Sequence, residues 1–376
     1  MRFVIFCHSL RSDWNHGNAH FLRGVVTELL ARGHDVRVFE PEDGWSAQNL
    51  VNDHGAAALD AYCQAYPGLG SILYDPSTLR LDEVLRGADV VLVHEWSAPE
   101  LVAAIGRQRA RGGRFTLLFH DTHHRAVTDR AAMAAFDLSA YDGVLAFGDI
   151  LRRIYLERGW AKRAFTWHEA ADTRVFQPRS GKAVEGDLVW IGNWGDEERT
   201  AELHEFLIDP VKRLGLKARV YGVRYPSHAL AALADAGIEY GGYLPNFQVP
   251  KVFPRFKLTV HVPRRAYATQ LPGIPTIRPF EALACGIPLI SAPWDDAEGL
   301  FTPGEDFLVA KDGDEMKQLM RRLLEEPAFG AAIAERGWRA IAGRHTCAHR
   351  TDELLAICHE LEGTRREGAV EGEARS

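Results

Sequence analysis

The stretch RFVIFCHSLRSDWNHGNAHFLRGVVTELLARGHDVRVFE, residues 2–40, decides the fold class. It begins with the apolar run RFVIFCH and ends with HDVRVFE, and both runs predict strands. Between them the apolar residues of HFLRGVVTELL recur at helical spacing, and Gly33 marks the end of the helix. Strand, helix and strand in this order predict a parallel sheet with a right-handed crossover.

The alternation of strands and helices continues along the chain. Residues 88–95, 114–121 and 142–149 are near-continuous apolar runs, which are typical of strands buried on both faces of a sheet. A second alternating set, with DLVWIGN and KLTVHVPR, follows a polar stretch that contains proline and glycine. We therefore predict an α/β protein with two Rossmann-like, doubly wound parallel-sheet domains that face a cleft.

The predicted boundaries divide the chain into five segments. Residues 1–172 form the N-terminal domain, residues 173–186 a linker and residues 187–345 the C-terminal domain. Residues 346–362 form a helix that packs back across the hinge. Residues 363–376 are charged and glycine-rich, so they are expected to be a disordered tail.

Composition limits the classes of function. The chain has 376 residues and a net charge of −7, which does not favour nucleic acid as a partner. Its five cysteines are scattered and odd in number, as is usual for reduced thiols in a cytoplasmic protein. The first residues resemble a strand more than a signal peptide, and no apolar run is long enough for a transmembrane segment. Peripheral membrane contact and a homodimer remain compatible with the sequence.

Polar side chains follow the predicted strands of the first half, where ligands of such sheets bind. His120 and Asp121 come directly after the run FTLLF and open the segment HDTHH. Either side chain could accept a proton from a substrate, and His120 is the better placed. A solvated polar loop is an equally good interpretation of this segment. Its spacing matches no zinc signature, so no metal is expected.

The second half carries glycine and arginine at its strand ends, and arginine there suits a diphosphate. Gly17 precedes the first predicted helix. A glycine there is compatible with backbone amides that approach a phosphate, although a tight turn is the commoner reason for a glycine at such a position. The patterns GxGxxG and GxxxxGK[ST] do not occur, which argues against dinucleotide oxidoreductases and P-loop NTPases. The candidate nucleotide-binding residues are Gly17, Gly192, Asn193, Arg199, Arg224, Arg264, Arg278 and Glu281.

Glu281 stands in the apolar stretch RPFEALACGIPLISAP, residues 278–293, and has two interpretations. Pro279 to Cys285 is predicted as a helix and Pro288 to Ala292 as a strand. A carboxylate in the first turn of that helix would be stabilised by the helix dipole, which makes Glu281 a cap. Alternatively, Glu281 accepts hydrogen bonds from a ribose diol, as acidic residues do in dinucleotide sites.

Two stretches carry a family resemblance. Residues 17–41, GNAHFLRGVVTELLARGHDVRVFEP, resemble the opening of the GT-B glycosyltransferases. Residues 278–293, together with GEDFLVAKDGDEM at 304–316, resemble the donor-binding signature of their group-1 type, and the start of this signature is most similar to the CgeB-like branch. The resemblance implies metal-independent sugar transfer, an acceptor on the first domain and Glu281 on the donor ribose. Gly273 stands where retaining members have a second glutamate, and Asn193 and Glu198 stand where they have arginine and lysine.

We therefore predict a metal-independent glycosyltransferase of the hexosyltransferase type. Its nucleotide-sugar donor is a co-substrate, and no cofactor is expected. The acceptor is a glycan, a lipid-linked molecule or a small molecule, and the base and stereochemical outcome stay open. The alternatives are a nucleotide-sugar 2-epimerase of the same fold, which needs acid–base carboxylates, and a non-catalytic nucleotide-sugar-binding protein.

Overall fold

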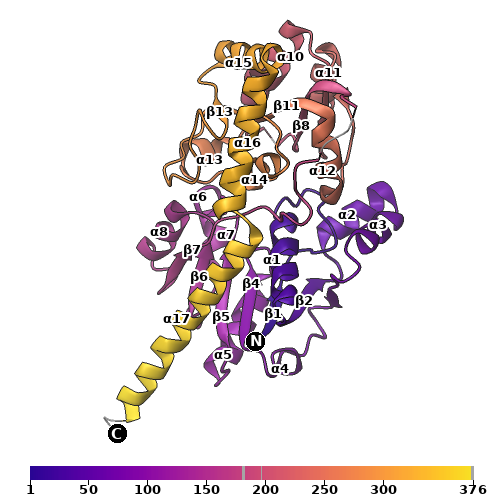
Figure 1. Ribbon diagram of the computed structural model, residues 1–376. Coiled ribbons are helices and arrows are strands. Elements are labelled where there is room, and N and C mark those ends of the chain that lie inside the picture. The colour runs from indigo at the N-terminus through magenta and orange to yellow at the C-terminus, as the bar shows by residue number, and fades with distance from the viewer. Residues whose placement is uncertain (180–182, 196, 374–376) are drawn as a thin grey trace. The chain divides into compact units, whose positions relative to one another are not determined.

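The computed structural model describes residues 1–179, 183–195 and 197–373 (Figure 1). The chain divides into two compact units, each with a parallel sheet of its own. Unit 1 comprises Met1–Ser12, Leu22–His168 and the residues from Cys347 onward. Unit 2 comprises Asp13–Phe21 and Glu169–Thr346, so a short piece from the start of the chain groups with the second half.

Unit 1 is built on a seven-stranded parallel sheet in the order β3-β2-β1-β4-β5-β6-β7. The central strands are buried along nearly their whole length, which explains their continuous apolar runs. They lie side by side among the indigo and purple strands of Figure 1. The strands are β1 (Arg2–Phe6), β2 (Asp35–Pro41), β3 (Ile72–Tyr74), β4 (Val90–His94), β5 (Thr116–Asp121), β6 (Gly143–Ala146) and β7 (Ala164–Thr166). The helices are α1 (Ala19–Ala31), α2 (Trp45–His54), α3 (Ala57–Ala65), α4 (Leu81–Val84), α5 (Pro99–Ala110), α6 (Arg125–Thr128), α7 (Arg130–Ala134), α8 (Asp149–Glu157) and α17 (Cys347–Glu373), of which α1 starts with three residues that group with unit 2.

Unit 2 is built on a six-stranded parallel sheet in the order β10-β9-β8-β11-β12-β13. Successive residues of β8 point to opposite faces: Leu188 and Trp190 join one apolar cluster, and Val189 and Ile191 join another. The strands are β8 (Gly186–Ile191), β9 (Ala218–Tyr221), β10 (Glu239–Tyr240), β11 (Phe256–His261), β12 (Leu289–Ser291) and β13 (Leu308–Val309). The helical elements are α9 (Thr200–Leu203), η1 (His204–Ile208), α10 (Asp209–Leu214), α11 (Ser227–Asp235), η2 (Asn246–Gln248), α12 (Val249–Val252), η3 (Phe253–Arg255), α13 (Arg265–Thr269), α14 (Ile277–Ala284), α15 (Gly313–Glu325) and α16 (Pro327–Arg344).

Three local features differ from the sequence pattern. The helix predicted from Pro279 begins two residues earlier, at Ile277, and Pro279 fits because the first-turn N–H groups have no partner within a helix. The helical stretch after β8 is not regular throughout: it contains a π-helical turn, η1, just before Pro210, which has no N–H for regular helix bonding. Helix α17 continues to Glu373, into the stretch for which the composition predicted disorder.

Helix α17 is anchored to unit 1, where the indole Nε1 of Trp167 donates to the backbone oxygen of Arg350 at 2.8 Å. Arg32 of α1 forms an ion pair with Asp352 at 2.5 Å. Among the residues that the structure describes, no helix combines the length and apolar character needed to cross a membrane.

Candidate functional site

Helix α14 presents Glu281 from inside unit 2. Every residue of this helix except Arg278 is buried, and the exposed fraction of Glu281 is 0%. Glu281 is the fifth helical residue, and the first turn contains no acidic side chain. The capping interpretation is therefore wrong, because a carboxylate at this position is too far along the helix to accept from its first N–H groups.

The carboxylate of Glu281 is held by three side chains. Asn246 donates its Nδ2 to Oε1 at 2.5 Å, and Nδ1 of His20 lies 3.4 Å from the same oxygen. Arg278, one helical turn earlier, forms an ion pair with Oε2. Burial raises the pKa of Glu281, while the charge of Arg278 and the hydrogen bond from Asn246 oppose that shift. These donors stabilise the ionised form of a carboxylate that water does not reach.

A second carboxyl group, Glu169, lies in the same unit. Its side chain is 5% exposed and accepts a hydrogen bond from Nδ2 of Asn18 at 2.9 Å. Burial, together with the charge of Glu281, raises its pKa to about 7. Sequence analysis did not single out this residue, which stands three positions after the end of β7. Its place near a strand end was the available signal.

The side chain of Arg199 is held by hydrogen bonds to the backbone. Its guanidinium donates to the backbone oxygens of Val262, Asn193 and Trp194 at 2.7, 2.5 and 3.4 Å. Burial, together with the nearby positive charges of Arg264 and Arg278, lowers the pKa of Arg199 to about 9. The structure therefore brings Arg264 and Arg278 each within electrostatic range of Arg199. An anion that entered this region would relieve their mutual repulsion.

Gly192 and Asn193 connect the ends of β8 and β9. A Cβ atom at Gly222 would lie 2.2 Å from the backbone oxygen of Gly192, so only glycine permits this approach. Asn193 accepts from the N–H of Val223 at 2.9 Å and donates to Asn15 Oδ1 at 2.5 Å. These bonds fix both loops at the carboxyl edge of the sheet, where ligands of such sheets bind.

Gly17 also lies in unit 2. A Cβ atom there would approach Cγ2 of Ile277, at the start of α14, to 3.3 Å. The small residue therefore allows the segment Asp13–Phe21 to pack closely against the helix that carries Glu281.

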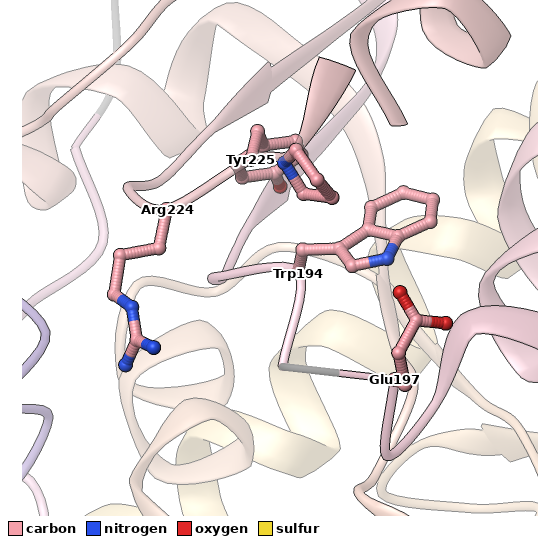
Figure 2. A pocket seen from close by; sticks show the side chains of 5 residues that line it. Trp194, Glu197, Arg224 and Tyr225 are labelled. Carbon is pink, nitrogen blue, oxygen red and sulfur yellow. The ribbon is translucent and has the colours of Figure 1, made fainter. Parts of the chain in front are cut away.

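A pocket of about 510 Å³ opens beside these strand ends (Figure 2). It is lined by Trp194, Glu197, Arg224, Tyr225 and Pro226. The rings of Trp194 and Tyr225 are 5.8 Å apart, and Arg224 extends its guanidinium away from them in Figure 2. Both Glu197 and Arg224 have positive φ angles, 69° and 60°, which are uncommon for such side chains and are often found at functional sites.

Unit 1 contains the predicted bases, His120 and Asp121. Asp121 accepts from the hydroxyl of Tyr155 at 2.7 Å, and burial raises its pKa to about 6. His120 is 1% exposed and lies between the rings of His94 and Trp167, at 5.2 and 4.8 Å. Burial lowers its pKa to about 3, so the imidazole is neutral at physiological pH, as a proton acceptor must be.

The rest of the HDTHH segment is ordered by a buried ion pair. Glu95 accepts from Arg125 Nη2 at 2.7 Å and from the N–H of Thr122 at 3.2 Å. Arg125 also stacks over the ring of Trp96, 4.2 Å from its centroid. Within the described part of the chain, no group of three or more histidine, cysteine, aspartate or glutamate side chains could hold a metal ion. A role for His120 in proton transfer stays a prediction.

Two family models match different halves of the chain. Residues 17–175 match the family described as Glycosyltransferase Family 4, and residues 199–356 match the family described as Glycosyl transferase-like. Among curated protein sequences, none matches this chain. Both halves thus match glycosyltransferase families, in agreement with the predicted reaction class.

Solved structures show the same fold at low sequence identity. Sucrose-phosphate synthase from Thermosynechococcus elongatus aligns with a TM-score of 0.67 at 14% identity, over 97% of this chain and 100% of its own. The HepE protein of Anabaena, in complex with UDP and glucose, gives 0.66 at 12%, over 96% and 100%. An α-glucosyltransferase in complex with UDP and a 13-mer DNA gives 0.67 at 12%, over 96% and 99%. The chain has the GT-B fold, and that prediction is confirmed.

Proposed function

We propose that this chain is a glycosyltransferase that binds a nucleotide-sugar on unit 2 and transfers its sugar to an acceptor. The observation that carries the proposal is Glu281, a fully buried carboxyl group paired with Arg278 in the unit whose strand ends hold the other arginines. Both matched families are glycosyltransferases, which supports the reaction class. The low-identity neighbours with UDP support a nucleotide-sugar as the donor.

Glu281 can bind a ribose if Arg278 changes partner. A carboxylate has about four lone-pair sites, and Asn246 and Arg278 already use two of them. The side chain of Arg278 is 31% exposed, so it can turn towards a diphosphate and release Oε2. The two ribose hydroxyls then donate to Glu281, and Arg278 moves to a stronger anion.

Transfer breaks the bond between the anomeric carbon and the diphosphate oxygen and forms a bond to an acceptor oxygen. The leaving diphosphate takes up negative charge, which Arg199, Arg264 and Arg278 stabilise electrostatically. In an inverting reaction the acceptor proton passes to a base, and His120 or Asp121 is the candidate. In a retaining reaction no protein base is required at that step.

Several finer assignments belong to the same proposal. The acceptor is a glycan, a lipid-linked molecule or a small molecule, and no divalent metal is needed. Similarity at residues 278–293 favours the CgeB-like branch and a cytoplasmic enzyme. A homodimer is compatible with this assignment.

A second candidate function is favoured by Glu169. A 2-epimerase acting on nucleotide-sugars needs acid–base carboxylates near its substrate, and Glu169 has a pKa of about 7 through burial beside Glu281. Such a group can give or take a proton near neutral pH.

A thermal-shift screen with UDP-glucose, GDP-mannose and dTDP-glucose tests the proposal. We expect one of the three to raise the melting temperature, and product analysis then separates the functions. Sugar transfer only with an added acceptor supports the glycosyltransferase, and an epimerised donor without acceptor supports the epimerase. Binding without turnover across a broad acceptor panel indicates a non-catalytic protein, and no stabilisation by any donor contradicts a nucleotide-sugar site.

A further inference from the structure

His20 lies beside Glu281, and its hydrogen bonds favour one tautomer of the imidazole. Its side chain is 1% exposed and packs edge-on against Phe176, with ring centroids 4.1 Å apart. The backbone N–H of Asp172 donates to Nε2 of His20 at 2.8 Å. Since Nε2 is the acceptor, a neutral imidazole must carry its proton on Nδ1.

The proton on Nδ1 sets the orientation of Asn246. Nδ1 lies 3.3 Å from Oδ1 of Asn246, so the histidine donates and the amide oxygen accepts. The amide nitrogen of Asn246 is then directed at Glu281, where it donates to Oε1 at 2.5 Å. Donors and acceptors match along the whole series, from the N–H of Asp172 through His20 and Asn246 to Glu281.

We propose that His20 is a positioning residue for donor binding, which acts through Asn246 to hold the carboxyl group of Glu281 in the correct orientation. This inference rests on the proposed function, because it assigns to Glu281 the contact with the donor. It adds a residue from the segment Asp13–Phe21, which comes from the start of the chain and groups with unit 2. Arg278 can leave Oε2 when a donor binds, whereas His20 and Asn246 keep Oε1 in place.

Two substitutions at the same position separate positioning from packing. His20→Asn places an amide N–H near the position of Nδ1 and keeps the donor towards Asn246, but it loses the acceptor for Asp172. His20→Gln reaches the N–H of Asp172 and keeps that acceptor, but it loses the donor on the Glu281 side. Both variants remove the ring that packs on Phe176, so both are expected to lower the melting temperature by similar amounts.

Calorimetric titration with the nucleotide-sugar that gives the largest thermal shift measures the difference. We expect His20→Gln to weaken donor binding about tenfold. The variant loses the hydrogen bond to Oδ1 of Asn246, whose amide nitrogen in turn donates to Glu281. His20→Asn should stay within a factor of about three of the wild type. His345→Gln is the matched control: His345 is a buried histidine of unit 2 that bonds to the Leu300 oxygen at 2.7 Å, and its loss should reduce stability only.

Equal affinities of the two His20 variants would overturn the inference. A long-range ¹H–¹⁵N spectrum of the unliganded protein gives an independent readout, with the His20 signal identified by its loss in His20→Asn. The Nδ1–H tautomer is expected, and an Nε2–H tautomer or an imidazolium at pH 7 would contradict the proposal. If Glu281→Gln weakens donor binding and His20→Gln does not, only this inference fails. If Glu281→Gln has no effect on donor binding, the proposed function fails with it.

Discussion

Replacing Glu281 by glutamine tests the proposed donor site most directly. The substitution keeps the shape of the side chain and removes its charge. Each charge-assisted hydrogen bond to a ribose hydroxyl contributes about 1.5–3 kcal/mol. Glutamine keeps one acceptor oxygen, so we expect the loss of about one such bond, which is a ten- to hundredfold weaker affinity for the nucleotide-sugar.

The structure also sets the expected change in stability. The amide nitrogen of glutamine must face either Arg278 or Asn246, and both side chains are donors at these contacts. An unmatched buried donor costs about 1–3 kcal/mol. Part of this loss is offset, because burial raises the pKa of Glu281 and the ionised form is therefore unfavourable by itself. We expect the free energy of unfolding to fall towards the lower end of that range.

Calorimetric titration and urea unfolding of the same samples measure both quantities. Glu305→Gln is a suitable control, because Glu305 also pairs with an arginine, Arg336 at 2.9 Å, but on the surface. The affinity for the nucleotide-sugar should also depend on pH. Because the pKa of Glu281 is raised, the wild type should lose affinity on acidification at a pH above the usual pKa of a glutamate. The glutamine variant should show no such loss. Unchanged affinity together with lower stability would refute the assignment of Glu281 to the donor.

Three further predictions concern Glu169, His120 and divalent metal. A glutamate with a raised pKa destabilises the fold as pH rises, so the contribution of Glu169 to stability should fall between pH 4.5 and about 7, by up to about 3 kcal/mol. Glu169→Gln should remove this part of the slope in unfolding curves, and the part due to Asp121 and Glu281 should remain. His120→Ala should lower turnover by about 10²–10⁴-fold with donor affinity unchanged, and a normal rate would leave HDTHH as a structural loop. Saturating EDTA should change donor affinity by no more than a few-fold, because arginines supply the positive charge; loss of binding restored by manganese would contradict this.

The fold was predictable because doubly wound sheets leave a strong pattern. Strands such as β4 and β5 are buried throughout, so their sequences are apolar runs that stand out from the amphipathic helices between them. Helix ends were less predictable. Pro279 was interpreted as the first residue of α14, but proline is tolerated throughout a first turn, and the helix begins at Ile277.

The environment of the site could not be predicted in the same way. Glu281 was identified from its motif, but its partners His20 and Asn246 are distant in sequence and carry no pattern of their own. Hydrogen bonds between such side chains depend on how loops meet, which periodicity does not encode. The same holds for Arg199, whose hydrogen bonds to three backbone oxygens could not be inferred from its place after a strand.

The segment Asp13–Phe21 has a consequence for the modularity of this chain. It lies between β1 and the body of α1, yet it supplies Asn15, Asn18 and His20 to unit 2. A chimera joined at the linker would combine this segment from one parent with residues 169–346 from another, and the buried amide and imidazole contacts would no longer match. The nine residues Asp13–Phe21 and the residues Glu169–Thr346 are therefore expected to be inherited together. A chimera that exchanges donor specificity should fold and bind only when both segments come from the same parent.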